Sequence, residues 1–104
     1  MKHIGVDITT ISRFEKVDSY FARRILSDAE FELFQTLQDD KKAKFLARAW
    51  AIKEAIFKAN NDYYEFSKIN LQKINHRWTF KNFEISISHE KDLLIAFVIE
   101  REGD

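Results

Sequence analysis

Six polar side chains interrupt apolar stretches of this chain and are its candidate chemical groups. In chain order they are Asp7, Glu54, Lys58, Ser86, Ser88 and His89. Two carboxylates far apart in sequence can share Mg²⁺, which takes oxygen ligands and completes its shell with water and phosphate oxygens. A nearby lysine can hold a phosphate as a point charge, and hydroxyl groups can bind it more weakly. The set therefore predicts a Mg²⁺-dependent phosphoryl-transfer site. The chain has no glycine-rich phosphate loop, which argues against a kinase or a nucleotide hydrolase.

Each of these groups also has a simpler structural interpretation. Asp7 could cap the helix that follows it, although Thr9 and Thr10 are also placed to do so. Glu54 and Lys58 could be an ordinary surface pair one helical turn apart, which contributes a few tenths of a kcal/mol. His89 could satisfy backbone groups at the end of a strand. The residues alone leave these alternatives open.

The element that positions Glu54 and Lys58 is predicted to be a long helix over residues 42–59. This segment is rich in helix-forming residues and contains neither Gly nor Pro. Its apolar residues surround most of the helix, which indicates burial on more than one side. Ala47 and Ala51 continue the face of Glu54 and Lys58, and we expect these small residues to leave room for a ligand.

The remaining pattern predicts an α+β domain. Residues 4–8 form a short buried strand in which Gly5 allows close approach of another backbone. Helices are expected over 11–17 and over 27–37, where Ser27 and Glu30 match a capping box. Strands follow at 69–72, 78–80, 83–88 and 93–99, the last a central strand because it is apolar throughout. The order of strand, helices and antiparallel sheet is typical of the α+β class.

Length and composition limit the possible functions. The 104 residues predict a single domain, 1–104, with a modest core that oligomerisation could extend. The 17 basic and 17 acidic residues cancel, which argues against a nucleic-acid-binding protein. The absence of Cys excludes disulfides and thiolate chemistry. No segment is typical of a signal peptide or a membrane span, so we expect a cytoplasmic protein.

Three segments in order resemble one known family, the holo-[acyl-carrier-protein] synthases, which are small 4′-phosphopantetheinyl transferases. Residues 4–8 are similar to its N-terminal strand. Residues 50–59, from Trp50 to Ala59, resemble its helix pattern aromatic-Ala-x-Lys-Glu-Ala-x-x-Lys-Ala. Residues 86–89 and the apolar strand that follows resemble its C-terminal segment. The agreement covers residues 1–60 and 84–100.

The resemblance implies a reaction, a cofactor and an assembly. The family transfers the 4′-phosphopantetheine group of coenzyme A to a serine of apo acyl carrier protein, a step in fatty acid and lipid biosynthesis that releases adenosine 3′,5′-bisphosphate. Its small members are homotrimers with active sites shared between neighbouring subunits.

The resemblance also assigns roles to residues. Asp7 and Glu54 correspond to the Mg²⁺ ligands, and Lys58 to the phosphate-binding lysine; these three form the expected catalytic set, in which Glu54, or a metal-bound water held by Asp7, takes the proton of the serine. Further residues fall on positions that bind coenzyme A, namely Lys58, Ser86, Ser88 and His89. Arg48, one place before the arginine position of the family, is also expected to bind coenzyme A. Arg13 and Arg24 fall on positions that meet the acidic carrier protein.

Three departures from the family pattern leave a second function open. Ala49 stands where the family has an arginine, with Arg48 one place earlier, and Glu84 stands where many members have a histidine. Between Asn60 and Phe83 the usual Gly-rich turn and further helix are missing, which affects the region expected to bind adenine. The alternative is a catalytically inactive module of the same fold that binds the carrier protein.

Overall fold

The computed structural model describes residues 3–102 of the chain. Its elements are, in order, β1 (His3–Thr10), the 3₁₀ helix η1 (Ile11–Phe14), α1 (Ser19–Ile25), α2 (Asp28–Thr36), α3 (Asp39–Ala59), the 3₁₀ helix η2 (Phe66–Lys68), β2 (Gln72–Ile74), β3 (Arg77–Thr79), β4 (Phe83–Glu90) and β5 (Leu93–Glu100). The α+β class expected from the sequence is confirmed. Within the described range, no helix is both long enough and apolar enough to cross a bilayer.

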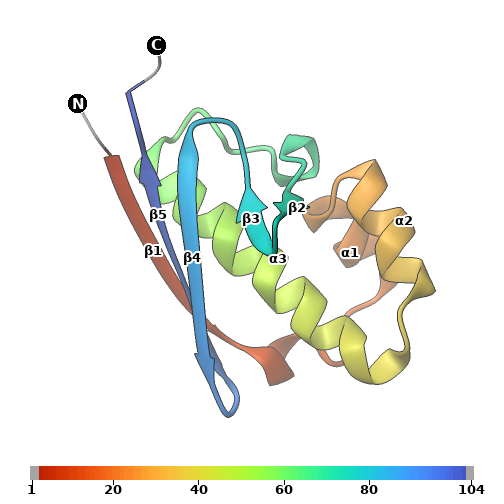
Figure 1. Ribbon diagram of the computed structural model, residues 1–104. Helices are drawn as coiled ribbons and strands as arrows, with labels where there is room; N and C mark the ends of the chain where they lie inside the picture. The colour runs from red at the N-terminus through yellow and green to blue at the C-terminus, as the bar shows by residue number, and fades with distance from the viewer. Residues whose placement is uncertain (1–2, 103–104) are drawn as a thin grey trace.

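The main sheet is antiparallel, with β5 between β1 and β4. The expectation that residues 93–99 form the central strand is therefore confirmed. Helix α3 lies across one face of this sheet, while no element of residues 3–102 covers the other face (Figure 1). Apolar side chains cover that second face and remain exposed, namely Ile4, Val6, Ile8, Leu93, Ile95 and Phe97. We call these six residues the bare sheet face.

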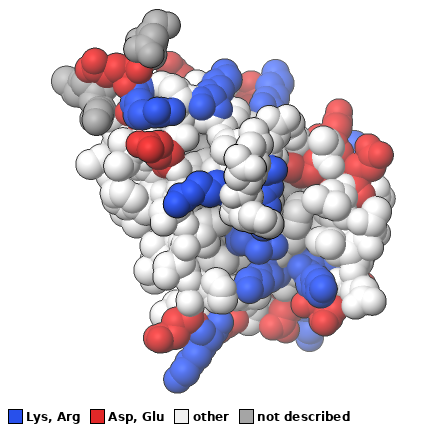
Figure 2. Space-filling model, in the orientation of Figure 1, with Lys and Arg blue, Asp and Glu red and all other residues white. Residues whose placement is uncertain are grey.

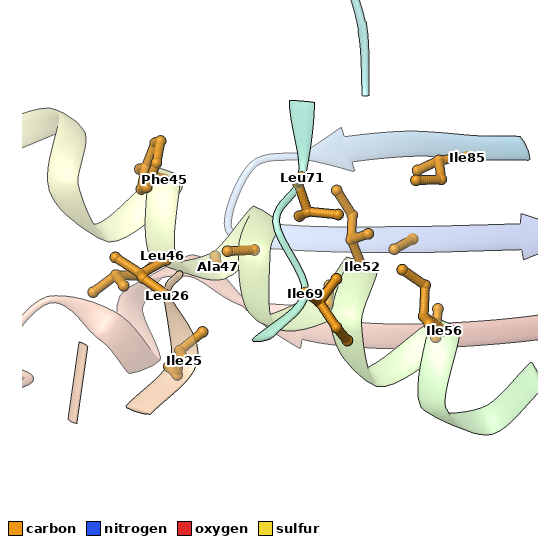
Figure 3. Close-up of a cluster of buried hydrophobic side chains, with 14 of the residues drawn as sticks. Ile25, Leu26, Phe45, Leu46, Ala47, Ile52, Ile56, Ile69, Leu71 and Ile85 are labelled. Carbon is orange, nitrogen blue, oxygen red and sulfur yellow. The ribbon is translucent and has the colours of Figure 1, made fainter. Parts of the chain in front are cut away.

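Helix α3 supplies the middle of the core, as its nearly continuous apolar surface predicts. Ile52 and Ile56 are completely buried and face Ile69, Leu71 and Ile85 from the second half of the chain (Figure 3). The helix begins at Asp39, three residues earlier than expected, where two acidic residues in its first turn complement the positive end of the helix dipole. The expectation that Ala47 and Ala51 leave room for a ligand was wrong, because both have no exposed surface.

The smaller helices differ from the sequence expectation at their ends. The capping box is confirmed: Ser27 caps α2 and accepts a hydrogen bond from the amide of Glu30, whose side chain bonds back to the amide of Ser27. The helix expected over 11–17 is only a 3₁₀ turn that ends at Phe14. A separate helix, α1, follows it because Asp18 caps the amide of Phe21.

The strand expected at 69–72 lies later in the chain. Ile69 and Leu71 are buried, so their alternation reflects a loop that packs into the core, and β2 begins only at Gln72. Strands β2 and β3 form a separate two-stranded hairpin that turns at Asn75 and His76, both with positive φ. In Figure 1 this hairpin lies between β4 and α3.

Candidate functional site

Strand β1 brings Asp7 to helix α3 because Gly5 lets the two backbones meet. A Cβ atom at Gly5 would lie 1.8 Å from the carbonyl oxygen of Ala55. The close-approach role expected for this glycine is thus confirmed. Along β1, Gly5, Asp7 and Thr9 are the more buried residues, while their neighbours belong to the bare sheet face. Asp7 therefore lies beside the second half of α3.

Asp7 and Lys58 form the contact at the centre of the first half of the site. The Lys58 Nζ atom lies 3.0 Å from Asp7 Oδ1 and 3.1 Å from the carbonyl oxygen of Val6. The second carboxylate oxygen, Oδ2, is buried and has no hydrogen-bond partner. Asp7 therefore does not act as a helix cap, and Thr10, which precedes η1, makes no side-chain cap bond either. One carboxylate oxygen of Asp7 is thus paired with the Lys58 amine, and the other lacks a hydrogen-bond partner in the described chain.

Glu54 is the second carboxylate of this half-site, one helical turn before Lys58. Its pKa is raised above the ordinary value, first because the carboxyl is partly buried and second because the charge of Asp7 opposes its ionisation. Lys58 and Arg13 act in the opposite direction. Asp7, Glu54 and Lys58 are thus brought together, with the positive charge of Arg13 nearby.

Arg13 reaches this neighbourhood from η1. Its guanidinium lies 4.9 Å from the ring centre of Trp50, which is on α3 one turn before Glu54. The position of η1 is set by the turn between β4 and β5, because the carboxylate of Asp92 accepts hydrogen bonds from the amide and the hydroxyl of Ser12 at 2.9 and 2.6 Å. Arg24, in contrast, is exposed on the last turn of α1.

A basic pocket of about 440 Å³ forms the second half of the candidate site. It lies between α3, the β2–β3 hairpin and β4. Its lining residues are Arg48, Lys73, Asn75, His76, Arg77, Trp78, Ile85, Ser86, Ile87 and His89. None of them is acidic. Figure 2 shows Lys and Arg side chains gathered near the middle of this face, while most acidic side chains lie toward its rim.

Arg48 is the most informative residue of the basic pocket. Partial burial lowers the pKa of its guanidinium, whose Nε atom is buried without a hydrogen-bond partner. The guanidinium lies 5.8 Å from the ring centre of Trp78, and the Nζ of Lys73 lies 5.4 Å from the same ring. A half-buried cation without a carboxylate partner in the described chain is suited to an anion that arrives from outside.

The candidate residues of β4 divide between the two faces of the sheet. Ile85 and Ile87 turn toward the core and Ser86 and Ser88 are exposed, as their alternation predicts. His89 follows the isoleucines, and its Nε2 atom lies 3.4 Å from Lys44 Nζ on α3. Ser86 and His89 line the basic pocket, whereas Ser88 does not.

The two half-sites lie on opposite edges of the sheet. Asp7 is on β1 and His89 on β4, with β5 between them, which separates the outer strands by about 10 Å. On α3, Arg48 and Glu54 are six residues apart, which turns their side chains by about 120° relative to each other. One chain therefore unites Asp7, Glu54 and Lys58 in one place, and Arg48, Ser86 and His89 in another.

Sequence reasoning missed the contribution of the hairpin to the basic pocket. The sequence alone assigned no role to Lys73, His76, Arg77 or Trp78. The pattern that could have shown part of this contribution is Lys73 opposite Trp78 across a tight Asn-His turn, because directly opposite residues in a hairpin share a face.

The chain was compared with known proteins. The family model for the 4′-phosphopantetheinyl transferase superfamily matches residues 3–100. A holo-[acyl-carrier-protein] synthase of Mycoplasma mobile is 57% identical over 102 residues, which cover 98% of this chain and 92% of that protein. The synthase of Mycoplasmopsis pulmonis is 50% identical and covers 91% and 86%, respectively.

A solved structure has the same fold. The crystal structure of a holo-(acyl-carrier-protein) synthase from Bacillus anthracis, in complex with CoA (3′,5′-ADP), matches with a TM-score of 0.80 and 28% identity, over 93% of each chain. The family match, the near-complete coverage by relatives and the shared fold agree with one another. The chain belongs to the holo-[acyl-carrier-protein] synthases of the 4′-phosphopantetheinyl transferase superfamily.

Proposed function

We propose that this chain transfers the 4′-phosphopantetheine group of coenzyme A to a serine of apo acyl carrier protein. The products are holo acyl carrier protein and adenosine 3′,5′-bisphosphate. Family membership supports this reaction. The observation that carries it is the unpartnered Asp7 Oδ2 beside Glu54 and Lys58, because this arrangement is suited to an external cation and offers an amine to a phosphate.

The donor set fits Mg²⁺. Within residues 3–102 there is no cluster of three or more His, Cys, Asp or Glu side chains that could hold a metal. Two carboxylates are enough for Mg²⁺, which usually keeps several waters and takes further oxygens from substrate phosphates. Asp7 and Glu54 would be its protein ligands. Bound there, the ion would supply positive charge that offsets the negative charge of the diphosphate.

The remaining steps are assigned to side chains of this half-site. The exposed amine of Lys58 would bind an oxygen of the diphosphate and stabilise the charge that develops during transfer. The serine oxygen attacks the β-phosphorus, and the bond from that phosphorus to the bridging oxygen breaks, so the bisphosphate leaves with the electron pair. Glu54 would take the serine proton, because its carboxylate lies in the same half-site as Asp7 and Lys58.

The basic pocket would hold the nucleotide end of coenzyme A. The diphosphate occupies the Asp7 half-site, which leaves a second anionic group, the 3′-phosphate, for a different cationic region. Arg48, Ser86 and His89 line such a region, and no acidic side chain opposes them. Ser88 would meet the same substrate from the exposed face of β4.

A homotrimer would complete the site. The bare sheet face exposes Ile4 at 60%, Val6 at 51% and Phe97 at 40%, which is costly in water and typical of a surface covered by another chain. A second copy placed on this face could bring its β4 edge to the β1 edge of the first. The two half-sites would then meet between subunits. The subunit number itself follows from the family resemblance.

The carrier protein would dock near Arg13 and Arg24. Arg13 lies beside Trp50 and close to Glu54, so a partner bound there could deliver its serine to the first half-site. Arg24 on α1 would add attraction for an acidic partner, which mainly raises the association rate. We expect the protein to act where both substrates are present, in the cytoplasm.

The deciding measurement is the intact mass of apo acyl carrier protein after incubation with the protein, coenzyme A and Mg²⁺. The expected result is a gain of one phosphopantetheine that EDTA abolishes. Lys58→Ala should reduce the rate by about 10² to 10³-fold, the usual cost of removing one group that stabilises transition-state charge. Lys68→Ala, at an exposed lysine of η2, is the matched control and should keep the normal rate. Carrier binding without any mass gain would instead support the inactive module.

A further inference from the structure

Lys53 is a buried lysine that the proposed reaction does not use. It directly precedes Glu54 on α3 and has no exposed surface. Its Nζ atom donates to Glu30 Oε1 at 2.6 Å, to the carbonyl oxygen of Ile25 at 2.8 Å and to that of Phe66 at 2.9 Å. All three donors of the ammonium group are thereby satisfied. Since successive helical residues differ by about 100°, Lys53 points away from the half-site of Glu54.

Glu30 completes a network around this ammonium group. Its Oε1 atom also accepts from the amide of Ser27 at 2.9 Å, and its Oε2 atom accepts from the amide of Leu71 at 2.6 Å. The hydroxyl of Ser27 donates to Asn70 Oδ1 at 2.7 Å. We call Lys53, Glu30 and these bonds the buried hub.

The buried hub joins helix α3 to segments that are distant in sequence. They are the end of α1, the start of α2, η2 and the chain just before β2. Leu71 is the last residue before the hairpin that supplies Lys73, Arg77 and Trp78 to the basic pocket. All three residues of β2 are exposed, so β2 itself contributes little burial that could fix the hairpin. The bond from the Leu71 amide to Glu30 and the bond from Ser27 to Asn70 therefore tie the start of the hairpin to the helical layer.

We propose that Glu30 and Lys53 are positioning residues that set the hairpin wall of the basic pocket relative to Glu54 on α3. Neither touches the substrate. This inference rests on the proposed function, in which the basic pocket binds coenzyme A. Of the two neighbouring residues, Lys53 would position the hairpin and Glu54 would take part in the reaction.

The test removes both charges together, in the variant Glu30→Leu/Lys53→Met. A single substitution would leave an unpaired buried charge and destabilise the whole fold, whereas the double variant leaves no buried charge. It removes the ion pair together with the bonds of these side chains to the backbone of Ser27, Leu71, Ile25 and Phe66. Hydrogen exchange at the amides of residues 71–79 should become at least about tenfold faster, because the hairpin opens locally. The KM for coenzyme A should rise about tenfold while kcat changes less than about twofold, because substrate binding is weakened but the reacting groups are not.

The matched control is Phe34→Leu. Each variant is measured at a temperature the same number of degrees below its own unfolding midpoint. Phe34 packs against Phe31 and Phe45 and belongs neither to the buried hub nor to the basic pocket. It should leave both the hairpin exchange and the KM for coenzyme A unchanged. Equal effects in the control and the double variant would overturn the positioning role and leave only a general stabilising one.

A second variant covers the case in which the double variant does not fold. Asn70→Ala removes the hydrogen bond from Ser27 to the chain just before β2 and leaves the Glu30–Lys53 pair intact, and it should shift exchange and KM in the same direction by a smaller factor. Unchanged hairpin exchange in this variant would also overturn the inference. Hydrogen exchange needs no substrate, so the buried hub is tested even if the wild-type protein transfers nothing, an outcome that would count against the proposed function alone.

Discussion

At the scale of single residues, Asp7 and Glu54 form a pair of carboxylates that oppose each other's charge. Lys58 offsets part of this repulsion, but Oδ2 of Asp7 stays buried without a partner. A bound cation would satisfy this oxygen and relieve the repulsion at once. The same arrangement that we propose for catalysis should therefore cost stability when no metal is present.

This cost can be measured with Glu54→Gln in EDTA. The pKa of Glu54 is raised in the folded protein, so its contribution to stability is present at low pH and is lost as the pH rises through that pKa. At pH 7 the neutral glutamine should therefore make the fold more stable, by no more than about 0.5 to 1 kcal/mol because the carboxyl is partly solvated. Near pH 4 and below, where Glu54 is protonated, the two proteins should unfold alike in thermal melts.

Mg²⁺ should reverse the order at pH 7. A ligand that binds only the folded state stabilises it, and the wild-type protein should gain stability while Glu54→Gln gains less. Glu32→Gln, an exposed glutamate on α2, serves as the control and should behave like wild type throughout. A stability gain for Glu54→Gln that is the same at every pH would contradict the assigned charge effect.

At the scale of elements, the contact between β1 and α3 decides whether Asp7 reaches Glu54 and Lys58. This contact depends on the missing side chain of Gly5, not on an unusual backbone conformation, since none of the described glycines has a positive φ. Strand β1, which carries Asp7, can thus pack against α3, which carries Glu54, only because residue 5 has no Cβ atom.

Gly5→Ala should separate β1 from α3. The added methyl would lie 1.8 Å from the carbonyl oxygen of Ala55, and both partners are backbone, so relaxation is expensive. We expect a loss of about 2 to 3 kcal/mol in the free energy of unfolding, at the upper end of the usual cost of overpacking. Chemical denaturation measures it. Glu32→Ala at the surface should change the same quantity by less than about 0.5 kcal/mol, and a similarly small effect at Gly5 would disprove the tight contact.

Much of the element order could be predicted from sequence because periodicity reports which side of an element is buried. Residues 42–59 and 93–99 were placed correctly for this reason. The pattern failed at Ile69 and Leu71, where a loop packs into the core with the spacing of a strand, and at Ala47 and Ala51, where small residues are fully buried in the core and leave no room for a ligand. In both cases burial by distant segments decided the outcome, and local sequence does not carry that information.

The candidate site could be predicted only as a set of residues, and its spatial division could not. Side-chain chemistry indicated which groups act on phosphate. Whether Asp7 and His89 lie together depends on strand order, and β5, the last strand in the chain, lies between theirs. The hairpin residues Lys73 and Arg77 were missed because a three-residue strand is too short to show a period.

At the scale of the whole molecule, the proposed homotrimer would explain both the bare sheet face and the separated half-sites. A heterologous interface repeated around a three-fold axis places different edges of neighbouring subunits together. In the proposed trimer, the apolar surface would supply the association energy, and each site would be built from the β1 edge of one subunit and the β4 edge of the next.

Mixing two defective variants tests this division of the site. Lys58→Ala damages the β1 half and Arg48→Ala the β4 half, so each alone should lose most activity in the carrier-mass assay. In co-expressed mixed trimers, about one site in four combines two intact halves if subunits assort randomly around a closed ring. The mixture should therefore recover about a quarter of the wild-type rate.

The control mixture combines Lys58→Ala with Asp7→Asn, which damage the same half and should not restore each other. A mixture of Lys58→Ala and Arg48→Ala that stays as inactive as its parts would mean that each chain builds its site alone. Recovery in the control mixture would mean that the two halves are assigned wrongly.

Lys53 and Glu54 point to different sides of α3, and this restricts how the length of that helix can change during evolution. Single side chains can be exchanged, but one residue inserted into α3 would rotate everything after it by about 100°. Glu54 would then lose Asp7, or Lys53 would lose Glu30, whichever side of the insertion is held in place. Insertions and deletions should therefore accumulate after α3, which includes the segment between Asn60 and Phe83 where the sequence pattern alone predicts the largest departure from the family.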